Sequence, residues 1–143
     1  MTNKVPQFES SGNAVEIVCY LVVQGFTCPD DEITSALGVV PTKTWVAGDL
    51  VTPFTVHRHK DTGWQLRPSD VSTSVDAALL TLLDMLPKGS IPARLPSSAI
   101  ARIHLGLTGL TERPSFTVSP VVLKRLADTE VALSVDPYDL TAS

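Results

Sequence analysis

The stretch PTKTWVAGDLVTPFTVHRHKDTGWQL, residues 41–66, decides the fold of this chain. It opens on Pro41-Thr42, reaches a glycine-aspartate pair at Gly48-Asp49, and closes on Gly63-Trp64 followed by Gln-Leu. Proline, glycine and aspartate are typical of turns, whereas tryptophan is typical of buried anchors. These residue types fix a backbone and do not make a recognisable catalytic set. We therefore expect this stretch to determine the fold and not to perform catalysis.

Within this stretch the pattern predicts two strands, at 43–50 and 63–67. Residues 51–59 alternate only loosely between apolar and polar, and the sequence leaves their state open. Trp64 follows a turn and lies in the second strand. We predict that it is buried against the leucine stripe of a helix at 75–86, because consecutive elements usually lie adjacent in space.

The remainder of the chain predicts further strands and three helices. Apolar residues alternate along the strands and recur at three-and-four spacing along the helices. The additional strands are expected at 14–24, 99–108, 115–118 and 131–135, and the helices begin near Pro29, Ser74 and Pro120. The order β-α-β-β-α-β-β-α-β is typical of an α+β domain with a largely antiparallel sheet and helices on one face. Two β-α-β halves, at 14–50 and 99–136, suit a ferredoxin-like arrangement.

Length, charge and cysteine content narrow the class of protein. The 143 residues predict a single domain with a core at about 14–140 and a polar N-terminal arm at 1–13. A net charge of −4 and the lack of a basic run argue against nucleic-acid binding. The apolar run 14–23 is too short for a membrane span and follows no basic leader, so we expect no membrane contact and a cytoplasmic protein. Cys19 and Cys28 are then expected to be reduced.

Several short motifs, in their order and spacing, resemble a known family. The motif Pro-x-x-x-Ile-Thr-x-x-Leu-Gly spans residues 29–38, Pro41-Thr42 precedes Gly48-Asp49, Trp64-x-Leu66 lies in a strand, Ser74 starts a helix, and Asp136-x-Tyr138 follows the last strand. In these features residues 15–138 resemble the domain-of-unknown-function family 4279. The resemblance implies a small bacterial protein of unassigned activity, in some members linked to toxin-immunity gene arrays. It transfers no catalytic residue to this chain.

Two histidines are the candidate metal ligands. His57 and His59 are two residues apart, so in an extended strand both face one side, at a spacing that suits a metal ion. Asp49 or Asp61 would add a carboxylate, but no complete ligand set is apparent, and exposed histidines on a hairpin are the alternative interpretation. We find no glycine-rich phosphate loop, nucleophile turn or dinucleotide fingerprint, so we expect no cofactor.

Three consecutive acids give the first third of the chain its charge. Asp30, Asp31 and Glu32 lie among residues 1–40, which hold one Lys and five acids. At the start of a helix they complement the positive end of the helix dipole. The same acids would steer a basic partner protein toward this surface.

These observations favour a non-enzymatic protein-binding module, inhibitor-like or immunity-like. We predict partner contacts at the acidic triplet and at Trp45, which is otherwise an anchor of the core. One alternative is a metal-binding or hydrolytic enzyme that uses His57 and His59. Another is a purely structural or oligomerising module, and the sequence leaves the oligomeric state open.

Overall fold

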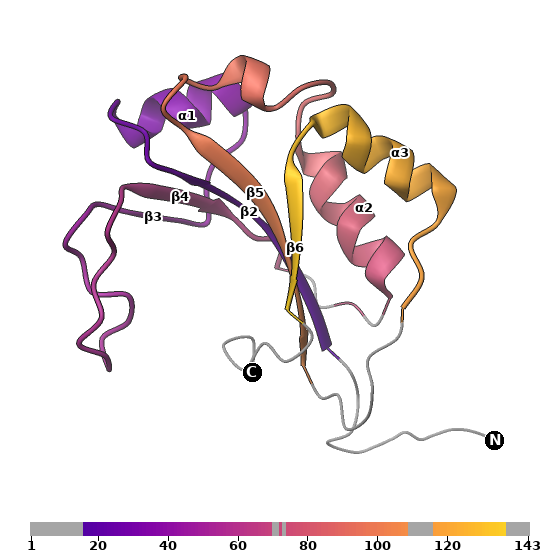
Figure 1. Ribbon diagram of the computed structural model, residues 1–143, viewed down its shortest axis with the longest axis horizontal. Coiled ribbons are helices and arrows are strands. Elements are labelled where there is room, and N and C mark those ends of the chain that lie inside the picture. Colours follow the sequence, from indigo (N-terminus) through magenta and orange to yellow (C-terminus); the bar gives the residue numbers. More distant parts are fainter. Residues whose placement is uncertain (1–15, 70–71, 73, 109–115, 137–143) are drawn as a thin grey trace.

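The computed structural model describes residues 16–69, 72, 74–108 and 116–136 (Figure 1). Its elements, in chain order, are β2 (Glu16–Gln24), α1 (Asp30–Leu37), β3 (Lys43–Trp45), β4 (Gly63–Leu66), α2 (Val75–Met85), the short 3-10 helix η3 (Pro92–Arg94), β5 (Ile100–Thr108), α3 (Pro120–Thr129) and β6 (Ala132–Asp136). The predicted α+β class is confirmed. The prediction of a strand at 115–118 is wrong for residues 116–118, which belong to no strand. Ser115 lies outside the described residues.

The strands form one five-stranded sheet in the order β3-β4-β2-β5-β6. Neighbouring strands run antiparallel except β5 and β6, which are parallel. The sheet is therefore largely antiparallel, as predicted.

A ferredoxin-like arrangement is present. Its first half lies where the sequence predicted it, and its second half does not. From β2 to β5 the elements follow the order β-α-β-β-α-β. In each β-α-β unit a third strand lies between the two: β4 lies between β2 and β3, and β2 lies between β4 and β5. The half predicted at 99–136 differs, because β5 and β6 are direct neighbours. The second ferredoxin-like unit is β4-α2-β5, and α3-β6 extends the sheet.

The helices share one face of the sheet, as predicted (Figure 1). Along β2 the odd-numbered side chains belong to the hydrophobic core, namely Ile17, Cys19, Leu21 and Val23. They meet Ile33 of α1, Leu79 of α2 and Val122 of α3 in a single cluster of buried residues. The side chains on the opposite face of the sheet include Tyr20 and His104, whose rings lie 4.8 Å apart between centroids.

The helix boundaries follow local chemistry. Ser74 and Ser119 are N-caps, with hydroxyl groups that accept from the backbone N–H of Ala77 and Val122. Asp30, Asp31 and Glu32 form the first turn of α1, where they complement the helix dipole. The helix predicted to begin near Pro29 begins at Asp30, with Pro29 as its N-cap.

The predicted burial of Trp64 is confirmed: Trp64 shares one buried core cluster with the leucines of α2, and its hydrogen-bond partner comes from α1. Trp64 is fully buried, and its indole Nε1–H donates to Thr34 Oγ1 of α1 at 3.0 Å. The leucine-rich α2 packs mainly on β2, whereas α1 packs on β4. The reason is topological: β4 lies beyond β2 in the sheet, so the helix that follows β4 in the chain crosses to the β2 side.

Candidate functional site

Residues 46–62 form an arm that projects from the sheet between β3 and β4 (Figure 1). The arm begins with a turn in which Asp49 N–H donates to Val46 O, while the Asp49 carboxylate accepts from Val46 N–H at 2.9 Å. Gly48 has φ 97° in this turn, a conformation that side chains with a Cβ rarely adopt. The Gly48-Asp49 pair is thus a turn former, and the strand predicted at 43–50 ends at Trp45.

The two limbs of the arm are held together by backbone hydrogen bonds. His59 N–H donates to Asp49 O at 2.8 Å, and Val51 N–H donates to His57 O at 2.9 Å. Between these bonds Leu50 and Arg58 form an isolated β-bridge. Residues 51–59, which the sequence left open, are therefore the outer part of a narrow hairpin-like arm.

The tip of the arm is an ordered turn. Thr55 N–H donates to Thr52 O, and Pro53 occupies the second position of this turn, where its fixed φ is favourable. The Thr52 hydroxyl accepts from Phe54 N–H, and the Thr55 hydroxyl accepts from His57 N–H. Both threonines therefore fix the backbone that carries the tip side chains.

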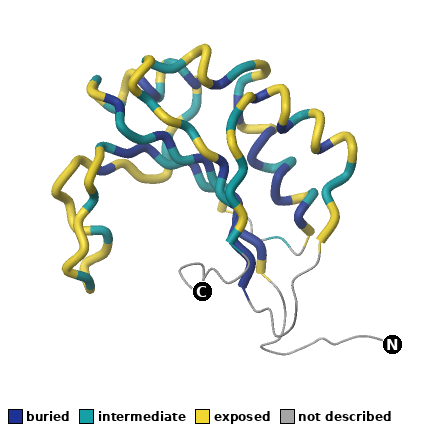
Figure 2. The backbone as a smooth tube through the Cα atoms, in the orientation of Figure 1, coloured by how far each residue is buried: buried dark blue, intermediate teal, exposed yellow. Residues whose placement is uncertain are grey.

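Large apolar side chains on the arm point into solvent. Phe54 is 97% exposed and Val56 is 89% exposed. Four of the eleven exposed large hydrophobic residues in the described part of the chain lie on this arm: Val46, Leu50, Phe54 and Val56. Figure 2 shows the arm as a largely exposed segment, apart from the body of the domain. Clustered exposed apolar residues on a folded domain mark interaction surfaces.

The base of the arm is a stack of two rings on a glycine. A Cβ on Gly63 would lie 1.9 Å from Trp45 Cε2, so the indole lies directly on the glycine backbone. The imidazole of His59 stacks on the same indole, with ring centroids 4.4 Å apart and planes inclined by 20°. Trp45 is only 8% exposed although it ends an edge strand. The indole of Trp45 is therefore buried by His59 of the returning limb and by Gly63, with which β4 begins.

Charges around this stack act on His59. Desolvation by burial and then the Lys43 ammonium lower the pKa of His59 from its ordinary value, and the Asp49 carboxylate opposes them. The Lys43 Nζ lies 5.7 Å from the centroid of the Trp45 ring. The imidazole is thus biased toward its neutral form.

The described part of the chain gives His57 and His59 no third metal ligand. Within the described ranges no group of three or more His, Cys, Asp or Glu side chains is arranged to hold a metal ion. His57 is exposed, whereas His59 packs on Trp45 and its Nε2 is buried. The imidazole of His59 therefore has a packing role that the sequence did not indicate.

The residues predicted to contact a partner do not form one surface. Asp30, Asp31 and Glu32 lie at the start of α1, which packs against the face of β4 that carries Trp64. Trp45 lies over Gly63, on the opposite face of the sheet. The two tryptophans consequently point to opposite faces of the sheet.

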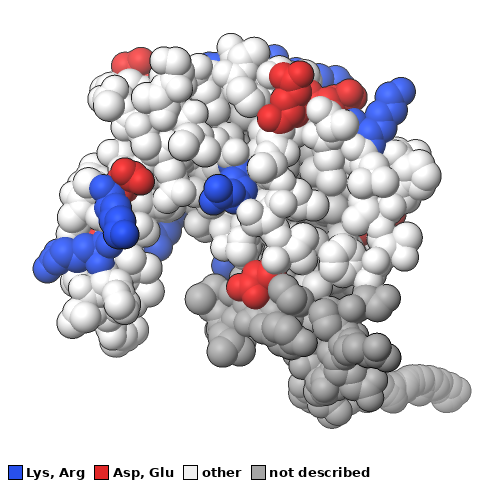
Figure 3. Space-filling model, viewed as in Figure 1, with Lys and Arg blue, Asp and Glu red and all other residues white. Residues whose placement is uncertain are grey.

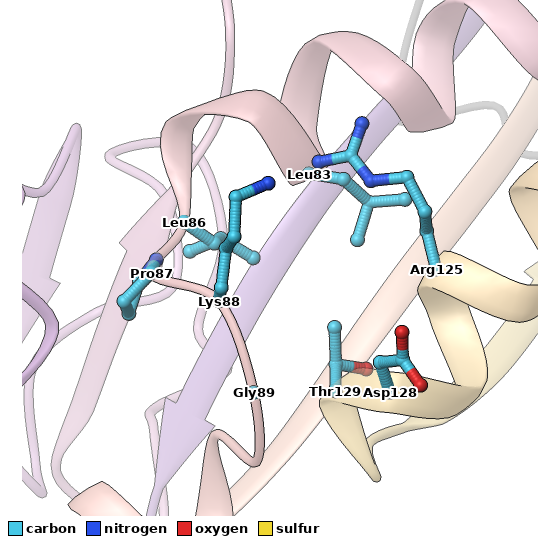
Figure 4. A pocket seen from close by; sticks show the side chains of 8 residues that line it. All are labelled: Leu83, Leu86, Pro87, Lys88, Gly89, Arg125, Asp128 and Thr129. Atoms are coloured by element: carbon cyan, nitrogen blue, oxygen red, sulfur yellow. The ribbon is translucent and has the colours of Figure 1, made fainter.

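A second candidate is a small cavity between α2 and α3 (Figure 4). Its volume is about 180 Å³, and Leu83 and Leu86 line its apolar side. Lys88 and Arg125 extend over these leucines, and Arg125 also forms an ion pair with Asp84 at 2.7 Å. Both helices end beside this cavity. The cavity is small for a ligand site.

Basic residues accompany the apolar ones on the arm. From Leu50 to Lys60 the chain holds Arg58 and Lys60 and no acid. Figure 3 shows Lys and Arg side chains on the lobe that the arm forms, which stands off from the main body. Sequence reasoning missed Phe54 and Val56 as site residues. The available signal was Pro53-Phe54 between two threonines, a turn sequence that contains a large aromatic residue.

The fold and the arm define a small α+β domain with one projecting, apolar-tipped hairpin. The chain belongs to the family described as domain of unknown function (DUF4279), whose model matches residues 15–140. The family resemblance noted from the motifs is confirmed. Searches of curated proteins and of solved structures found no match. No helix in the described part of the chain is long and apolar enough to cross a membrane.

Proposed function

We propose that this protein is a non-enzymatic protein-binding module and that the tip of the arm is its principal contact. The observation that carries the proposal is the near-complete exposure of Phe54 and Val56 on an ordered turn. A large aromatic side chain in water gains free energy when a partner buries it, and such residues dominate the energetics of interfaces.

The tip of the arm has an ordered backbone. This order favours the interpretation that Phe54 and Val56 are exposed in order to bind a partner. Thr52 and Thr55 hold the tip backbone through their hydroxyl groups. A segment that is ordered before binding loses less conformational entropy when the complex forms. The arm therefore has the features of a segment that is preorganised to insert into a partner protein.

The charges of the arm indicate the character of the partner. Arg58 and Lys60 follow the apolar tip on the returning limb, whereas the acids of the arm, Asp49 and Asp61, lie nearer its base. A complementary site is an apolar pocket with an acidic rim, which would accelerate association at low ionic strength. An inhibitor-like or immunity-like protein that inserts this arm into the cleft of an enzyme is one form of the proposal.

Affinity capture from the producing cells tests this proposal. Burying a large apolar side chain stabilises by about 1.5–3 kcal/mol, so the combined variant Phe54→Ser, Val56→Ser, which loses two such contacts, should bind at least roughly 100-fold more weakly. The matched control is Val121→Ser, Leu123→Ser, which removes two exposed apolar side chains from α3. Equal recovery of the same partner by the wild type and by both variants would exclude the tip as the contact.

A further inference from the structure

Two buried polar atoms at the base of the arm have no hydrogen-bond partner among the described residues. They are Trp45 Nε1 and His59 Nε2, the ring nitrogens of the two stacked side chains. A buried polar group without a partner destabilises the state that buries it, because water would satisfy it in an open state. We call the arrangement in which His59 stacks on Trp45 the closed arrangement of the arm. Its two buried nitrogen atoms destabilise it relative to an open arrangement, in which water would hydrate both.

The ring contact holds the closed arrangement. His59 reaches Trp45 from the returning limb of the arm, and Trp45 in turn lies on Gly63 of β4. The backbone of His59 is bonded to Gly48 and Asp49 of the outgoing limb. Movement of His59 away from the indole would therefore carry both limbs of the arm.

A proton on His59 would oppose this contact. The imidazolium would have a buried Nε2–H without an acceptor, and it would add a positive charge next to Lys43 on β3. On its own limb the neighbours are Arg58 and Lys60. The Asp49 carboxylate, from the outgoing limb, is the opposing charge, but it already accepts from Val46 N–H.

We propose that His59 is a proton-operated latch: its neutral ring holds the arm on Trp45, and its protonation releases the arm and exposes the indole. Since tryptophan is enriched among the residues that dominate interfaces, the released indole would supply a second anchor beside the tip. This consequence for binding rests on the proposed function, whereas the latch itself is a property of the chain alone.

The direction of the pH dependence follows from the sign of the shift. In the closed state the pKa of His59 is lowered, and in the open state it takes its ordinary value of 6.5. Above pH 6.5 His59 is neutral in both states, and the closed arm is favoured. As the pH falls from 6.5 through the lowered pKa, the open state binds the proton more tightly and gains population.

Fluorine NMR of the full chain labelled with 5-fluorotryptophan tests the latch. The two tryptophans give two signals, which Trp45→Phe assigns, and the buried Trp64 is an internal reference. Between pH 7.5 and 4.5 we expect the Trp45 signal to shift with a midpoint below 6.5 and to become sensitive to exchange of H₂O for D₂O. The Trp64 signal should keep its position.

Variants separate the latch from other titrations. His59→Phe keeps an aromatic ring on the indole and cannot gain a proton, so it should abolish the response of Trp45. His59→Gln, which removes the ring contact, should give the exposed signal at pH 7.5. His57→Gln, the matched control on the exposed neighbour, should titrate like the wild type.

Three results would overturn the latch: a Trp45 signal that does not move, one that moves equally in His59→Phe, or one that moves only together with Trp64. The outcome is independent of the proposed function. A Trp45 signal that titrates as expected, alongside serine variants of the tip that bind normally, would retain the latch and exclude the tip as the binding element.

Discussion

The contact between Gly63 and Trp45 makes Gly63→Ala the most informative stability variant. A Cβ at this position would lie 1.9, 2.0 and 2.4 Å from three atoms of the indole. Carbon atoms in favourable contact are about 3.5–4.0 Å apart, so the ring must retreat by roughly 1.5–2 Å. The ring is stiff, 8% exposed and stacked on His59, so this movement disrupts the stack.

The cost follows from two contributions. Overpacking of a well-packed site costs about 1–3 kcal/mol, and loss of an aromatic pair costs about 0.5–1.5 kcal/mol. We therefore expect Gly63→Ala to reduce the free energy of unfolding by about 2–4 kcal/mol. With a typical urea slope of about 1–3 kcal/mol per molar, the unfolding midpoint falls by roughly 1–2 M.

The effect of Gly63→Ala on the free energy of unfolding should change sign when the indole ring is absent. In the Trp45→Val background the three indole atoms that a Cβ on Gly63 would meet are absent, and alanine in a strand is more stable than glycine by about 0.5–1 kcal/mol. Gly63→Ala should then be neutral or stabilising, which a double-mutant cycle in urea measures. If the cost of Gly63→Ala is the same in both backgrounds, the placement of Trp45 on Gly63 is wrong.

Three further outcomes are expected. Thr34→Val leaves the buried Nε1–H of Trp64 without an acceptor and should cost about 1–3 kcal/mol in urea unfolding, whereas Thr34→Ser should retain most of the stability. Arg125→Ala breaks a surface ion pair with Asp84 and should cost less than about 1 kcal/mol, and a loss that persists in 1 M NaCl would contradict a screened surface pair. Burial raises the pKa of Cys19 to about 12, so its thiol should stay unmodified by iodoacetamide at pH 8 until the protein unfolds, as mass spectrometry of digested samples would show. Rapid alkylation of native Cys19 would contradict its burial.

The sequence predicted those features that depend on local chemistry. The caps at Ser74 and Ser119 and the alternation along β2 are set by nearby residues, and each was predicted close to its place. The hydrogen bond from Trp64 to α1 was not predictable in this way. It depends on which strands become neighbours in the sheet, and a single sequence contains no direct signal of that order.

The candidate site was harder to predict for a related reason. His59 and Trp45 are fourteen positions apart, and their contact arises because the arm folds back on its own base. From the sequence, His59 resembled a metal ligand because His57 is two residues away. Phe54 resembled an ordinary alternating apolar residue, and only its place on a projecting turn distinguishes it from a core side chain.

Site-specific photo-crosslinking in the producing cells tests the central claim most directly, namely that the tip of the arm contacts a partner protein. A photoreactive phenylalanine would replace Phe54, and the same group at Leu123 on α3 would be the control, since both side chains are exposed. We predict one discrete adduct of higher mass from position 54 on irradiation, and none from position 123. An absence of adducts from position 54, or the same adducts from both positions, would contradict the claim.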